Sequence, residues 1–86
     1  MNYEDWESEV YAEYERATSS YPPFASAHEG LAVILEEYEE LKDEVFKNPK
    51  KRDYNAMKRE AIQVAAMAIR FLVDVEPKYN SVEKEQ

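Results

Sequence analysis

The sequence lacks several features that mark common classes of protein. Its 86 residues include no cysteine, which excludes disulfide bonds and thiolate metal sites. No apolar run approaches the roughly 20 residues that a membrane-spanning helix needs. The acidic start of the chain is unlike a secretory signal or a transit peptide. We therefore expect a cytoplasmic protein with no membrane partner.

An excess of positive charge is also absent. The formal net charge is −8, whereas a general nucleic-acid-binding protein carries a dominant basic face. We therefore expect no direct binding of DNA or RNA. Six of the eleven lysines and arginines lie between Lys47 and Arg59, however, which leaves room for one small anionic ligand.

Alternating β-branched runs and hairpin signals are lacking too, and the apolar residues follow a helical period. Their spacing predicts α-helices over about residues 4–18, from between residues 23 and 27 to about residue 46, and over about residues 54–75. The predicted fold class is all-α, with one domain over residues 1–76. A polar, flexible tail is expected over residues 77–86.

Local signals support the ends of these helices. Ser26 and Glu29 fit a capping box at the start of the second helix, although Pro23 fits the first turn equally well. Asp53 is a suitable N-cap for the third helix. Gly30 costs roughly 1 kcal/mol relative to alanine inside a helix, and a close helix crossing is its simplest explanation.

The third expected helix is apolar on nearly every side. Within residues 61–73 only Gln63 and Arg70 are polar, and such a helix belongs at the centre of a bundle. Three helices of one short chain can hardly surround it. We therefore predict a helical bundle completed by homo-oligomerisation, as a homodimer or a dimer of dimers. Arg70 and Asp74 are spaced as an ion pair on the helix surface.

The second expected helix concentrates negative charge on one flank. Six carboxylates fall within the nine positions from Glu36 to Glu44, with Lys42 as the only cation among them. Neighbouring like charges on a helix each cost a few tenths of a kcal/mol, which a divalent cation would reverse. Glu60 opens the apolar part of the third helix, and an antiparallel arrangement would bring it alongside this flank. Carboxylate ligands favour Mg²⁺ or Mn²⁺ over zinc. The alternative is a solvated face on a plain helical interaction module.

These acidic motifs resemble the signature of MazG-like nucleoside triphosphate pyrophosphohydrolases, an all-α family. The segment E-E-Y-E-E at residues 36–40 precedes E-A-I-Q at residues 60–63, with nineteen residues between Glu40 and Glu60. The pair is similar to the family's E-x-x-E and E-x-x-D motifs, and the likeness spans about residues 20–75. The resemblance implies hydrolysis of a nucleoside or deoxynucleoside triphosphate to the monophosphate and pyrophosphate, with Mg²⁺ (or Mn²⁺ in its place) as cofactor.

Carried over residue by residue, the resemblance gives Glu37, Glu40 and Glu60 as metal ligands, with Gln63 where the family has an aspartate. A glutamine carbonyl can coordinate Mg²⁺ but adds no negative charge. Glu36 or Glu44 would orient the attacking water as general base. The departure at Gln63 leaves open a second function, that of a catalytically inactive relative that binds a nucleotide or a protein partner.

The remaining functional residues would contact substrate. Lys50, Lys51 and Arg52 follow the acidic helix and suit a phosphate clamp, or else balance the nearby acids in a solvated loop. His28 either contacts the metal or substrate, or serves as a packed or capping imidazole. Four aromatic side chains either stack on a base or belong to the core: Trp6, Tyr11, Tyr14 and Tyr21.

Overall fold

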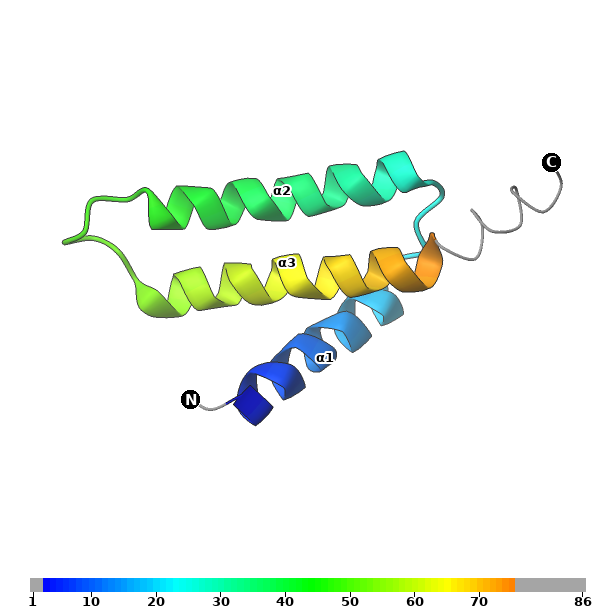
Figure 1. Ribbon diagram of the computed structural model, residues 1–86, viewed down its shortest axis with the longest axis horizontal. Helices are drawn as coiled ribbons and strands as arrows, with labels where there is room; N and C mark the ends of the chain where they lie inside the picture. Colours follow the sequence, from blue (N-terminus) through cyan, green and yellow to red (C-terminus); the bar gives the residue numbers. More distant parts are fainter. Residues whose placement is uncertain (1–2, 76–86) are drawn as a thin grey trace, which may run out of the picture.

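The computed structural model describes residues 3–75, which form three α-helices (Figure 1): α1 (Tyr3–Ser20), α2 (Ala27–Val45) and α3 (Tyr54–Asp74). No strand occurs among these residues, so the all-α prediction is confirmed. Helices α2 and α3 form an antiparallel hairpin, and α1 packs against α3. None of the described helices is long and apolar enough to cross a membrane. The tail predicted over residues 77–86 lies outside the described residues.

Helix α3 is the central element, as its apolar sequence predicted. It packs against both α1 and α2, and its buried residues are Ala66, Met67 and Arg70. The rest of the core consists of one residue of α1, one of the α1–α2 connector and one at the end of α3: Ala17, Phe24 and Val75. The core therefore lies beside the C-terminal half of α3, where the chain passes from α1 to α2.

The helix ends follow the capping signals in the sequence. The Ser26 hydroxyl accepts a hydrogen bond from the backbone N–H of Glu29 at 3.1 Å. The Glu29 carboxylate accepts one from the backbone N–H of Ala25 at 2.7 Å. Helix α2 therefore begins after Ser26 and not at Pro23. Asp53 caps α3 as predicted, by accepting the backbone N–H of Asn55 at 2.9 Å.

Gly30 lies at a close crossing between α2 and α3. A Cβ atom at this position would lie 2.7 Å from Cδ2 of Phe71 and 3.0 Å from Cδ2 of Phe24. Carbon atoms at van der Waals contact are about 3.5–4.0 Å apart, so no side chain fits here without movement. The close crossing expected from the sequence is confirmed.

Arg70 and Asp74 form the predicted ion pair, but they lie in the interior and not on the helix surface. Arg70 is only 4% exposed. Its Nη2 donates a hydrogen bond to the carbonyl of Pro22 at 2.8 Å, and its guanidinium lies 4.5 Å from the centre of the Phe24 ring. Asp74 accepts the backbone N–H of Phe24 at 3.1 Å, while its Oδ2 stands 3.9 Å from Arg70 Nη2. Both side chains hold the α1–α2 connector against α3, because the connector folds over the face that the isolated helix would expose.

Part of the apolar surface of the hairpin has no cover within the described chain. Leu31, Leu35 and Tyr38 lie on one face of α2 and are 62%, 52% and 50% exposed. Leu72 of α3 is 61% exposed. A few isolated apolar residues on a surface are ordinary, but three at helical spacing form a stripe.

Replacement of Gly30 by alanine tests the close crossing. Alanine favours the helix by about 1 kcal/mol, but overpacking a core costs typically 1–3 kcal/mol. We expect Gly30→Ala to lower the free energy of unfolding by about 1 kcal/mol, measured by urea denaturation. The double variant Gly30→Ala/Phe71→Leu should lose less stability than the two single changes sum to. A Gly30→Ala protein more stable than wild type would show that the crossing is loose.

Candidate functional site

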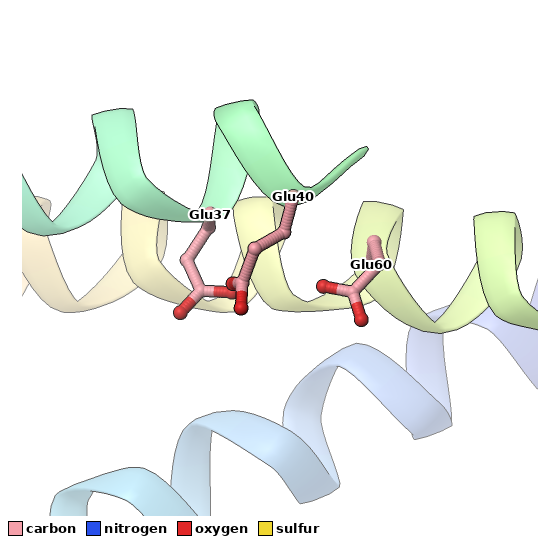
Figure 2. A group of neighbouring side chains, drawn as sticks. All are labelled: Glu37, Glu40 and Glu60. Carbon is pink, nitrogen blue, oxygen red and sulfur yellow. The ribbon is translucent and has the colours of Figure 1, made fainter. Parts of the chain in front are cut away.

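The register of the α2–α3 hairpin brings three predicted ligands together. Because Gly30 meets Phe71 and the helices are antiparallel, residues 37–40 of α2 lie opposite about residues 61–64 of α3. Glu37, Glu40 and Glu60 each offer a carboxylate oxygen, and these oxygens lie within 4.8 Å of one another. Figure 2 shows two of the side chains descending from α2 toward the third on α3. We call these three residues the carboxylate triad.

The triad holds more negative charge than its surroundings favour. The pKa of Glu37 is raised to about 7 by burial, by hydrogen bonding to Glu40 and by the negative charges nearby. The pKa of Glu60 is also raised, by burial and then by the charge of Glu40. Closely spaced carboxylates of this kind are oxygen ligands for a hard divalent cation, whose charge would relieve the repulsion. The donor set therefore fits Mg²⁺ or Mn²⁺.

A cleft of about 450 Å³ adjoins the triad at Glu37. Among the triad, Glu37 alone lines this cleft, together with the predicted base Glu36 and the predicted ligand Gln63. The other lining residues come from the end of α1, the α1–α2 connector, the first half of α2 and the second half of α3: Arg16, Ala17, Tyr21, Pro22, Phe24, Glu29, Val33, Met67 and Arg70. The cleft thus extends from the carboxylates to the buried core.

The two proposed general bases stand at opposite ends of the triad. Glu36 is exposed and faces the cleft. Glu44 lies near Glu60, whose pKa its charge helps to raise. Both carboxylate oxygens of Glu44 accept hydrogen bonds from Lys47 Nζ, at 2.9 and 3.0 Å. Glu36 is therefore the freer of the two to accept a proton in the cleft.

The predicted substrate-binding residues are not gathered at the triad. Lys50, Lys51 and Arg52 are exposed in the α2–α3 connector, which begins after Val45, about 7.5 Å along the helix axis beyond Glu40. His28 is exposed in the first turn of α2, at the other end of the helix. A role for these four side chains in substrate binding stays a prediction.

Two arginines of the cleft were missed by the sequence reasoning. Arg16 of α1 lines the cleft, and its pKa is raised mainly by its hydrogen bond to Glu13 and to the smallest extent by the charge of Glu37. Its nearest partner is Glu13, one turn earlier. Arg70 was assigned to the surface. Only the polar interruption of an apolar helix at Arg70 signalled a special position, whereas nothing local marked Arg16.

The four aromatic side chains do not share one environment. Tyr14 packs against the core, but Trp6, Tyr11 and Tyr21 are 46%, 60% and 61% exposed. Tyr21 lies on the wall of the cleft. The core thus takes one of the four aromatics, and Tyr21 is the one that reaches the site.

Comparison of the chain with protein-family models, curated proteins and solved structures found no significant match. The likeness to MazG-like enzymes therefore rests on the acidic motifs themselves.

The raised pKa of Glu37 makes the stability of the metal-free protein depend on pH. In the folded protein the Glu37 carboxyl keeps its proton up to about pH 7, whereas in the unfolded chain it loses the proton near its ordinary pKa of 4.5. The free energy of unfolding therefore falls as the pH rises from 4.5 to about 7. We expect Glu37→Gln to stabilise the protein at pH 8 and to have little effect at pH 5. With allowance for solvent screening, the gain at pH 8 is about 1 kcal/mol, or about 4–8 °C in Tm.

Thermal unfolding in EDTA at the two pH values measures this effect. Glu39→Gln is the matched control, because Glu39 is exposed and pairs with Lys42 at 3.1 Å. It should not stabilise the protein at pH 8. Equal pH dependence of wild type and Glu37→Gln would contradict the electrostatic description of the triad.

Proposed function

We propose that this protein is a MazG-like nucleotide pyrophosphohydrolase that hydrolyses a nucleoside or deoxynucleoside triphosphate in the presence of Mg²⁺. The supporting observation is the meeting of three carboxylates from two helices, at the positions of the E-x-x-E motif and of Glu60. An acidic helix on a plain interaction module needs no such convergence with a second helix.

The adjoining cleft adds to this proposal. A metal cluster on a flat surface can hold a cation, but a substrate also needs a concave site with a few polar groups. The cleft begins at Glu37, so a nucleotide whose phosphates lay at the triad could extend along it.

In the proposed reaction, Glu37, Glu40 and Glu60 would hold the magnesium ion, whose chemistry is to neutralise phosphate charge and activate water. Glu36 accepts a proton from the attacking water, whose oxygen bonds to the α-phosphorus. The bond from that phosphorus to the bridging oxygen breaks, and pyrophosphate leaves. Gln63 adds no charge to the site, which limits the electrostatic attraction for the cation.

Pyrophosphate release tests the activity. We expect wild type to release pyrophosphate from at least one member of a panel of NTPs and dNTPs with Mg²⁺ or Mn²⁺, and none in EDTA. Glu40→Gln should lower kcat at least 100-fold, because it removes one charged ligand. Glu39→Gln, one position away and exposed, should stay within about twofold of wild type. No release from any triphosphate, with no rise in Tm on addition of either cation, would contradict the proposal.

We also propose that the bundle is completed by a second copy of the chain. The supporting observation is the exposed stripe of Leu31, Leu35 and Tyr38 on α2, together with Leu72 of α3. Burying about 100 Å² of apolar surface contributes roughly 2.5 kcal/mol, so covering several such side chains compensates for the thin core of a short chain.

Sedimentation equilibrium tests the oligomer. We expect wild type to have at least twice the chain mass of 10.1 kDa, and Leu35→Glu to shift the equilibrium toward the monomer. Ser19→Glu is the matched control, because it adds the same charge at an exposed position outside the stripe. A wild-type protein that is monomeric at 100 μM would contradict this proposal.

A further inference from the structure

The cleft beside the carboxylate triad has the features of a ligand pocket in its own right. Its volume of about 450 Å³ falls in the range of about 300–1,000 Å³ typical of small-molecule sites. Its walls combine apolar side chains with a few polar groups, and they come from α1, the connector, α2 and α3. A merely solvated acidic flank would not produce such a pocket.

Its inner wall contains a buried, incompletely bonded cation. Arg70 is 4% exposed, and its Nε is a buried donor without a hydrogen-bond partner among the described atoms. Buried donors are rarely left without an acceptor, because the loss of hydration is not compensated. The other guanidinium nitrogens of Arg70 are engaged by Met67, Pro22 and Asp74, so this residue holds the wall of the cleft in place.

Gln63 belongs to this cleft more than to the triad. The hairpin register sets Gln63 level with Glu37 and sets Glu60 level with Glu40. Glu37 and Gln63 line the cleft, whereas Glu40 and Glu60 do not. An uncharged amide is a weak addition to a cation site, but its adjacent donor and acceptor match the edge of a nucleobase.

Tyr21 supplies a face for stacking. Tyr21 is 61% exposed as a residue and lies on the wall of the cleft, whereas one face of the Phe24 ring is covered by Arg70. Stacking of a base on an aromatic side chain contributes about 1–3 kcal/mol and accepts any base. Tyr21 and Gln63 therefore offer complementary contacts, one to the plane of a base and one to its edge.

We propose that this cleft binds the nucleobase of a nucleotide, with Tyr21 stacking on its plane and Gln63 hydrogen-bonding its edge. The proposal rests on the proposed function for the nucleotide class, and it assigns Gln63 to substrate selection instead of metal binding. Gln63 would then accept a hydrogen bond through its amide oxygen and donate one through its amide nitrogen to the base edge.

The test uses NMR with nucleoside 5′-monophosphates of the common bases, without divalent cations. We expect at least one of them to shift the side-chain amide signals of Gln63 and the ring signals of Tyr21. Ribose 5-phosphate and inorganic phosphate should leave both unchanged. Gln63→Leu should weaken binding of the preferred monophosphate about tenfold, as expected for the loss of hydrogen bonds to a base. Asn55→Leu, at an exposed position of the same helix, should not.

Two further measurements separate this proposal from the proposed function. Gln63→Leu should leave the affinity for Mn²⁺ within about twofold of wild type, and should raise KM for the preferred triphosphate about tenfold at unchanged kcat. If wild type releases pyrophosphate but no monophosphate shifts the NMR signals of Gln63 or Tyr21, the nucleobase site is overturned and the proposed function stands. Loss of Mn²⁺ binding in Gln63→Leu, with base binding intact, would overturn it by making Gln63 a ligand. Absence of metal binding and of turnover would refute the proposed function.

Discussion

The contact of Gly30 with Phe71 determines how α2 and α3 pack, and the arrangement of the site depends on it. Without a Cβ at this position, the rings of Phe71 and Phe24 lie close to the backbone of α2. The contact fixes both the spacing and the register of the hairpin. As a result, Glu40 of α2 lies beside Glu60 of α3, and Glu37 of α2 lies beside Gln63 of α3. A shift of one residue would rotate these side chains by about 100° around their helix and separate them.

This packing places unfavourable charge in the middle of the hairpin and favourable polar contacts at one end. The pKa values of Glu37 and Glu60 are raised first by burial and then by the negative charges nearby. At the other end, Arg70 and Asp74 tie the connector to α3 through Pro22 and Phe24. Local conflicts of this kind are typical of functional sites, where stability is lost for the sake of binding and regained elsewhere in the fold.

Much of the fold was predictable because local physics determines it. The helices followed from apolar period, and the starts of α2 and α3 from Ser26 and Asp53. The triad was predictable because a short connector makes neighbouring helices antiparallel. Arg70 was misassigned because its burial depends on the path of a connector 48 residues away in sequence. Arg16 was missed because the crossing of α1 over α3 leaves no local pattern in the sequence. The helical spacing of the apolar residues in α2 also does not indicate which of them α3 covers.

A Mn²⁺ titration followed by paramagnetic broadening of backbone amide signals is the most direct test of whether the hairpin register creates a divalent cation site. A specific site predicts that about one equivalent of Mn²⁺ broadens the signals of residues 37–40 and 60–63 first, and that Glu40→Gln abolishes this selectivity. Broadening that spreads equally over the other acidic segments, such as residues 5–15 of α1, would contradict it. The acidic flank of α2 would then be a solvated surface that attracts cations only through its net charge.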